Sequence, residues 1–326
     1  MISTPDQQAQ CALSIIIVSY GTRDDTLACL ASLYAHPPAV PFEVILFDNA
    51  SPDDSVAAIA AAYPQVRLIA SPDNLGFGAG NNAAAKLATG DRILLLNPDT
   101  IVLPHTFAGL IDFATRTPDR GIWGGRTLFG DGTLNPTSCW ASLSLWSLFV
   151  IMSGLTRAFP YTRLFDPEIY GGWQRDTESD VDIVTGCFLL IDRTLWERLG
   201  GFDPTFFMYA EEADLNLRAR RMGARPGISP AAELIHLGGR SETSRPDKMV
   251  KIMRGRTTLM RKHWSPVAYR LGLAMCWAWA LSRMLGSHIM PGRRDNPQSA
   301  RADRAAVWQR RREWLAGYPD VARTTD

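Results

Sequence analysis

The sequence contains no hydrophobic run long enough to cross a bilayer. Of its 326 residues, 46% are hydrophobic and 21% are charged, proportions that are ordinary for a globular protein. The most apolar stretch, 267–290, is interrupted by Arg270 and Arg283, with 12 residues between them. A helix needs about 20 apolar residues to span the hydrocarbon core. The sequence therefore excludes a protein with several membrane-spanning helices.

Features of secreted and of strongly charged proteins are also absent. Residues 1–10 are polar and include no apolar segment of a secretory signal peptide. None of the five cysteines forms a C-x-x-C pair, so we expect reduced thiols in a cytoplasmic protein. The formal net charge is +1, which gives no overall attraction to nucleic acid, and we expect no nucleic-acid partner.

Strands and helices alternate through the first hundred residues. The predicted strands are runs of aliphatic and β-branched residues at 14–19, 42–47, 66–70 and 92–96. The predicted helices between them lie at 24–34, 53–62 and 78–88. Such alternation predicts βαβ units and a mostly parallel sheet, whose ligands bind beyond the carboxyl ends of the strands.

Two segments carry candidate metal ligands. Asp99 follows a buried strand on the proline-stiffened turn Leu-Asn-Pro-Asp at 96–99, and hard oxygen ligands held rigidly suit a divalent ion that bridges two phosphates. A simple Asx turn that closes the strand explains the same residues. His236 follows a short apolar run and precedes two glycines; it is either a metal ligand or a structural hydrogen-bonding residue.

Two other segments are candidates for nucleotide binding. Asp48 and Asn49 end the second predicted strand and can hydrogen-bond a base or ribose, although Ser51 or Asp53 can also cap the next helix. The glycine-rich segment 74–82 lets the backbone approach a ligand closely, or is a plain loop-to-helix junction. It is neither a P-loop nor a dinucleotide fingerprint, because its spacing and its place after the third strand differ.

A cluster of carboxylates follows the aromatic run at 206–209. Glu211, Glu212 and Asp214 fall within four residues; carboxylates crowded against apolar surface have raised pKa values and can act as general bases. The same residues also suit a helix N-terminus through the helix dipole. Asp214 and Arg218 additionally have the spacing of an ion pair on one helix face.

Read together, these segments resemble one family, the inverting glycosyltransferases of family 2, and within it the bacterial rhamnosyltransferase-like branch. The matching motifs, which cover residues 12–264, are Val-Ser-Tyr-Gly at 18–21, Asp-Asn-Ala-Ser at 48–51, the Asn-x-Gly-Phe segment at 74–82, Leu-Asn-Pro-Asp at 96–99, the Gly-Gly-Phe-Asp to Arg segment at 200–218 and Arg-Lys-His at 261–263. Two positions depart from the family pattern. Gly21 stands where asparagine is common, and Glu212 replaces the usual aspartate.

The resemblance implies an α/β protein with a GT-A fold. A Rossmann-like, mostly parallel nucleotide-binding sheet would form the donor half, at about 12–125, and an acceptor-binding half would follow at about 126–264. Residues 265–326 lie outside the family pattern and are expected to form a helical, basic C-terminal extension.

The resemblance also implies a site and its ligands. Asp99, helped by His236, would hold Mg²⁺ or Mn²⁺ on the donor diphosphate. Glu212 would be the catalytic base, with Glu211 and Asp214 beside it. The expected nucleotide-sugar contacts are Ser19, Tyr20, Asp48, Asn49, Asn74, Gly76, Asn81 and Asn97. The donor implied is dTDP-rhamnose, with UDP-sugars next, and the acceptor is a glycan or a lipid-linked glycan of a cell-surface polysaccharide.

Two other classes of protein can share such an α/β fold. A sugar-1-phosphate nucleotidyltransferase would need a basic, glycine-rich loop near residues 19–25, which contain no lysine. A nucleotide-sugar-binding module would need neither the metal turn nor the carboxylate cluster.

The C-terminal extension combines apolar and cationic residues. Residues 267–290 include Trp277 and Trp279, and residues 291–326 hold eight arginines against five acids. Tryptophan prefers the bilayer interface and arginine meets anionic headgroups. We therefore expect peripheral binding at the cytoplasmic face of the cell membrane, although the segment could instead pack on the catalytic domain.

Overall fold

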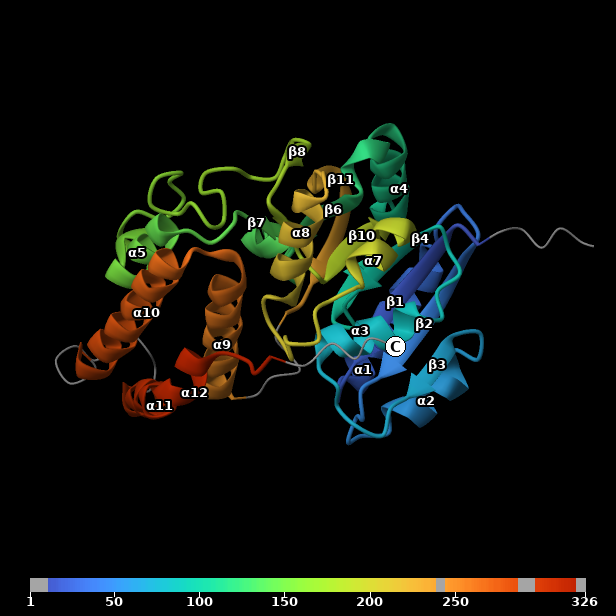
Figure 1. The fold of residues 1–326 in the computed structure, drawn as a ribbon. Helices are drawn as coiled ribbons and strands as arrows, with labels where there is room; N and C mark the ends of the chain where they lie inside the picture. Colours follow the sequence, from blue (N-terminus) through green and yellow to red (C-terminus); the bar gives the residue numbers. More distant parts are fainter. Residues whose placement is uncertain (1–10, 239–243, 287–296, 321–326) are drawn as a thin grey trace, which may run out of the picture.

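The computed structural model describes residues 11–238, 244–286 and 297–320. A nine-stranded sheet forms its centre (Figure 1), in the order β3-β2-β1-β4-β10-β6-β11-β5, with β8 paired to β11. The strands are β1 (Leu13–Ser19), β2 (Phe42–Asp48), β3 (Arg67–Ala70), β4 (Arg92–Leu96), β5 (Thr100–Val102), β6 (Ile122–Leu128), β8 (Ser179–Asp180), β10 (Phe188–Asp192) and β11 (Gly227–His236). A second sheet pairs β7 (Cys139–Trp140) with β9 (Ile183–Val184).

The central strands are buried on both faces, which is why they read as continuous apolar runs. Successive residues of β1 contribute to two separate cores because side chains alternate along a strand. Ile15 and Ile17 belong to one core, and Ile16 and Val18 belong to the other.

Helices cover both faces of the sheet. The first core is closed by α1 (Arg23–Ala35), α2 (Ser55–Ala62) and α4 (Thr106–Arg116), and the second by α3 (Phe77–Ala85), α7 (Arg193–Leu199) and α8 (Glu211–Arg221). This arrangement confirms the predicted α/β fold with its mostly parallel sheet. Six strands, β1 to β4 with β6 and β11, share one direction, while β5, β8 and β10 run against them.

The residues around β6 are rich in glycine, a composition that is typical of irregular structure, yet they form a strand. Gly124 and Gly125 sit in mid-strand, where a Cβ would come within 2.4 Å of a Val184 methyl and 2.0 Å of the Ala232 carbonyl oxygen, respectively. Glycine is required here because neighbouring chain segments come too close for a side chain, and not because the chain turns. Local sequence patterns cannot separate these two causes.

The C-terminal residues form a helical layer on the catalytic domain (Figure 1). Its helices are α9 (Arg245–His263), α10 (Pro266–Gly286), α11 (Pro297–Gln309) and α12 (Arg311–Ala316), and they pack with α5 (Leu145–Ser153), which the short α6 (Leu155–Ala158) follows. Their shared core contains Leu148, Met260, Cys276 and Trp314. In the described parts of the chain, no helix is long and apolar enough to cross a membrane.

Trp314 tests whether this layer belongs to the fold. Its side chain is fully buried and its indole N–H donates to the Val307 carbonyl oxygen at 2.9 Å. We expect Trp314→Ala to lower the free energy of unfolding, measured in urea, by about 3–5 kcal/mol. Trp277→Ala is the matched control, because that side chain is 42% exposed. Equal, small losses in both variants would contradict the packing described here.

Candidate active site

Asp99 and His236 meet at the carboxyl end of β4. The antiparallel pairing of β5 with β11 puts His236 opposite Thr100, and the Leu237 amide donates to the Asp99 carbonyl oxygen at 2.9 Å. The His236 Nε2 and Asp99 Oδ1 atoms lie 3.3 Å apart, and both side chains are largely buried. A strand pairing thus joins two residues that are far apart in the sequence.

The electrostatics of this pair favour a charged carboxylate. Burial by itself would raise the pKa of Asp99, but the His236 imidazole and backbone N–H groups lower it overall. Burial would likewise lower the pKa of His236, whereas the neighbouring Cys187 and Asp99 raise it to about 11. Each partner therefore stabilises the charged form of the other.

The donor set fits a divalent ion that is shared with a substrate. One carboxylate oxygen stands at a rigid strand end with the His236 imidazole beside it, which can bind the ion once it gives up its proton, and Asn97 nearby has a buried amide oxygen that lacks a partner among the described residues. In the part of the chain that the structure describes, no group of three or more His, Cys, Asp or Glu side chains is arranged to hold a metal ion. Mg²⁺ in proteins often has only one or two protein ligands and completes its shell with phosphate oxygens and water.

The strand β1 lies next to β4 in the sheet, and β2 lies next to β1. Tyr20 follows β1 and is 40% exposed. Asp48 accepts a hydrogen bond from the Ser51 amide with Oδ1, while its Oδ2 is buried and lacks a partner among the described residues. Ser19 points into the protein instead, because its hydroxyl bonds to Thr26 at 3.2 Å. The exposed Tyr20 and the open oxygen of Asp48 are thus the groups here that can reach a ligand.

The asparagines of the predicted nucleotide site mainly form hydrogen bonds within the protein that fix the backbone. The Asn49 amide group donates to Asn74 Oδ1 and to the Gly76 carbonyl oxygen, both at 3.1 Å, and its Oδ1 accepts from the Leu75 amide at 2.8 Å. Asn81 donates to the Phe77 carbonyl oxygen one turn back in α3. These bonds fix the shape of the glycine-rich segment that enters α3.

Gly76 allows that segment to dock on the aromatic run. It has φ of +82°, and a Cβ there would lie 2.2 Å from the Phe207 carbonyl oxygen, which accepts from the Phe77 amide. Asn82 makes a second link, because its side chain bonds to both the N–H and the carbonyl of Phe202. The sequence motif includes Asn82, but nothing in it indicates this role.

Glu211 and Glu212 begin α8 and face the sheet. Burial and the neighbouring Glu212 raise the pKa of Glu211 well above its usual value, and burial also raises the pKa of Glu212. One carboxylate oxygen of each is buried and has no partner among the described residues. Glu211 is only 3% exposed, and Glu212 is more accessible. Both carboxyl groups therefore hold a proton at a higher pH than an exposed glutamate does.

The turn 185–187 connects Glu212 to Asp99 and His236. A Cβ on Gly186 would lie 3.5 Å from the Glu212 Cβ. The Cys187 carbonyl oxygen accepts from the Asn97 amide at 3.0 Å, and its thiol lies beside His236. Glu212 and the end of β4 therefore both lie next to this short turn.

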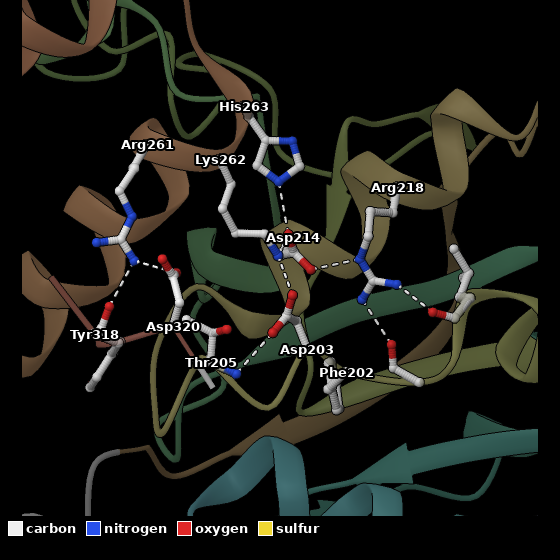
Figure 2. A network of polar contacts seen from close by, with 12 residues as sticks. Phe202, Asp203, Thr205, Asp214, Arg218, Arg261, Lys262, His263, Tyr318 and Asp320 are labelled. Carbon is white, nitrogen blue, oxygen red and sulfur yellow. Dashed lines mark hydrogen bonds and ion pairs between the residues drawn. The ribbon is translucent and has the colours of Figure 1, made fainter. Parts of the chain in front are cut away.

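Asp214 is the centre of a buried ionic network (Figure 2). Its carboxylate is fully buried and contacts Arg218 at 2.7 Å and both Lys262 and His263 at 2.8 Å. The same Arg218 donates to the carbonyl oxygens of Leu199 and Gly201, each at 2.8 Å. The network therefore ties α8 to the end of α9 and to the loop before Phe202.

The C-terminal residues reach the same region from the other side (Figure 2). The Tyr318 hydroxyl donates to the Met208 carbonyl oxygen at 2.8 Å, and the Arg254 guanidinium lies 4.4 Å above its ring. Arg261 donates to the Tyr318 carbonyl oxygen at 2.7 Å. These contacts hold the loop that leads into α8. Tyr318 lies outside every motif, so the sequence contains no signal for it.

Comparison with solved structures identifies the fold. A mannosyltransferase from Pyrobaculum calidifontis, solved in complex with GDP-Man and Mn²⁺, has a TM-score of 0.54 and 16% sequence identity, covering 96% of this chain and 85% of that one. This likeness shows the fold, which is the GT-A fold of nucleotide-sugar transferases.

Residues 14–199 match the family described as Glycosyl transferase family 2. The chain belongs to this family and is a glycosyltransferase, which confirms the resemblance seen in the sequence.

Among curated proteins, the chain is similar to rhamnosyltransferases. An N-acetylglucosaminyl-diphospho-decaprenol L-rhamnosyltransferase of Mycobacterium tuberculosis is 30% identical, over 69% of this chain and 75% of its own length. Rhamnosyltransferase WbbL of Escherichia coli is also 30% identical, over 68% of this chain and 82% of its own. O-antigen biosynthesis protein RfbC of Myxococcus xanthus is 30% identical, but the match covers only 17% of that longer protein.

The ionic network makes a prediction about stability. Asp214→Asn would leave Arg218, Lys262 and His263 without their shared counter-charge, and losing one partner of a buried ion pair costs about 3–5 kcal/mol. We expect that loss in the free energy of unfolding at neutral pH. The exposed Asp112, an i,i+4 partner of Arg116, gives the control Asp112→Asn, which should change little.

The loss of stability in Asp214→Asn should also depend on pH. His263, Arg218 and Lys262 overcome the effect of burial and lower the pKa of Asp214 from 3.8. Its charged form therefore stabilises the fold above pH 3.8, and this contribution disappears as the pH falls toward the lowered value. The difference between the native protein and Asp214→Asn should shrink below pH 3.8. A difference that grows on acidification would contradict the assignment.

Proposed function

We propose that this glycosyltransferase moves rhamnose from dTDP-rhamnose to a lipid-linked glycan at the cytoplasmic face of the membrane, with inversion at the sugar carbon. The names of the mycobacterial and Escherichia coli relatives support the sugar, and the first also specifies an acceptor on decaprenol diphosphate. UDP-sugars are the second choice of donor.

The observation that carries the proposal is the turn 185–187. Glu212 lies beside Gly186 of this turn, and Asn97 and His236 lie beside Cys187, which supports a base and a charge-stabilising pair close to one another. An in-line transfer needs a base on the acceptor hydroxyl and charge stabilisation on the opposite, leaving-group side. This arrangement supplies both.

Asp99 and His236 would hold Mg²⁺ or Mn²⁺, which when bound would offset the negative charge that develops on the leaving diphosphate. Asp48 and Asn97 would bind the nucleotide through their buried oxygens that lack a partner among the described residues, and Tyr20 would contribute a further contact. Asn49, Asn74, Gly76 and Asn81 would position the donor loop, and Ser19 would support it from within the core.

Glu212 would take the proton from the acceptor hydroxyl. It is the more accessible of the two glutamates, and burial raises its pKa, which makes it a stronger base than an exposed glutamate. The charge of Glu212 would in turn raise the pKa of its neighbour Glu211. Asp214 would be a positioning residue and not a proton carrier, because Arg218, Lys262 and His263 already bind its carboxylate.

Release of nucleoside diphosphate tests this function directly. The native protein is incubated with dTDP-rhamnose or UDP-sugars, and with Mn²⁺, Mg²⁺ or a chelator. We expect dTDP release that needs the divalent ion and increases with a polyprenyl-diphosphate N-acetylglucosamine acceptor. Release of pyrophosphate from a nucleoside triphosphate would instead identify a nucleotidyltransferase, and binding without turnover would identify a binding module.

The metal ligands make the first prediction of this function. Asp99→Ala should reduce kcat by at least about 10²-fold, because metal stabilisation of leaving-group charge contributes several kcal/mol. His236→Ala should reduce it less. Circular dichroism serves as the control for folding, since Asp99 lies at a strand end. Near-normal turnover of Asp99→Ala at saturating donor would rule out the metal assignment.

The second prediction of this function concerns Glu212 and Glu211. Glu212→Gln should lower kcat by about 10²- to 10⁴-fold, with donor affinity unchanged in calorimetry. Glu212→Asp, which restores the usual family residue, should keep part of the activity. In the active protein kcat should rise with pH through the raised pKa. A silent Glu212→Gln together with an inactive Glu211→Gln would reverse the two roles.

A further inference from the structure

An apolar, cationic surface lies at the end of the molecule formed by α5 and α10. Its exposed side chains come from two separate parts of the sequence: Trp146, Phe149, Phe159, Tyr161, Leu164, Val267 and Leu271. Tyr161 and Val267 are the most exposed, at 69% and 68%. We call these seven residues the aromatic surface.

Direct contacts join the parts of the aromatic surface. Trp146 stacks near Phe149 and Phe165, with ring centroids 5.6 and 6.3 Å apart, and Phe165 lies 5.1 Å from Phe159. The Trp146 indole donates to the Leu164 carbonyl oxygen at 2.8 Å. The helix α5 packs against α10 (Figure 1), where the site of a Gly272 Cβ lies 3.4 Å from Leu148.

The face of α10 that remains exposed is unusual for a helix in water. Its buried side uses the small residues Gly272, Cys276 and Ala280, while Val267 and Leu271 point outward. A helix that is apolar on its exposed face as well as on its buried one needs a second apolar environment there. Large exposed apolar patches of this kind indicate an interaction site.

The charges around the aromatic surface indicate which partner covers it. Arg157, Arg163 and Arg270 are exposed among these residues. The two segments that build the surface, 141–165 and 264–286, contain no aspartate or glutamate. Aromatic side chains beside arginines, without acids, match the interface of an anionic bilayer.

We propose that the aromatic surface docks the enzyme on anionic lipid. The inference deepens the proposed function, since a lipid-linked acceptor requires the enzyme at a bilayer. It also extends the membrane contact from the segment 267–290, which the sequence suggests, to α5 and residues 159–164, and it gives less weight to the arginines further along the chain. Arg310 is engaged by Asp247 and Glu313, and Arg311 lies over the Trp308 ring; Arg293 and Arg294 lie outside the described residues.

Vesicle co-sedimentation tests the surface with the full chain. Vesicles of phosphatidylcholine, with and without phosphatidylglycerol, are mixed with the native protein at low and high salt. We expect binding that needs phosphatidylglycerol and weakens in high salt, because each arginine near an anionic surface contributes about 1 kcal/mol. A native protein that ignores phosphatidylglycerol vesicles at low salt overturns the proposal.

Two double variants and one control locate the contact. Phe159→Ser with Leu164→Ser, and Arg157→Glu with Arg163→Glu, should each weaken partitioning by about tenfold or more. Met222→Ser removes an equally exposed side chain at the end of α8 (41%) and should leave partitioning unchanged. Loss of binding in the control as well, or in neither double variant, overturns the assignment to this surface.

Two further measurements distinguish lipid docking from the proposed function and from an interface between two copies of the chain. Donor hydrolysis in lipid-free buffer should be unchanged in the double variants, which also shows that they fold. If vesicles bind as expected but no sugar is transferred, the docking surface stands and the proposed function fails. If sedimentation equilibrium finds a native dimer that both double variants dissociate, the surface is an interface between two copies and the lipid proposal is overturned.

Discussion

The buried carboxylate of Asp214 is the constraint on which the candidate site depends. A fully desolvated charge is tolerated only with close partners, and Arg218, Lys262 and His263 supply them from two helices. Satisfying that charge fixes the angle between α8 and α9. The two glutamates lie within one turn of Asp214 on the same helix, so their orientation toward the sheet follows from this ionic contact.

A second constraint acts on the loop before α8. Tyr209 and Ala210 have φ of +67° and +76°, a conformation that costs a residue with a side chain about 1–3 kcal/mol. Close packing maintains it: a Cβ on Gly255 would lie 2.3 Å from the Tyr209 carbonyl oxygen, and the Tyr318 hydroxyl holds the Met208 carbonyl. The strained residues therefore lie where three parts of the chain converge on the start of α8.

How far the sequence predicts this structure depends on the range of the interactions. The strands β1 to β4 follow from local apolar runs, and Asp48 and Asp99 stand at strand ends as predicted. The pairing of His236 with Asp99 comes from the β5–β11 register, which local patterns do not encode. The C-terminal extension was recognised as helical, but its packing rests on contacts such as Trp314 in a shared core, which only the folded chain brings together.

The unpaired polar atoms of the site are its most informative feature. Native proteins pair nearly all buried polar groups, because each orphan costs about 1–3 kcal/mol. Among the described residues, Asp48, Asn97, Glu211 and Glu212 each keep one buried oxygen without a partner. Helix dipoles favour charge on the two glutamates, yet burial outweighs that effect and raises both pKa values. The fold accepts this cost at the ends of β2 and β4 and at the start of α8, where donor and acceptor would supply the missing partners.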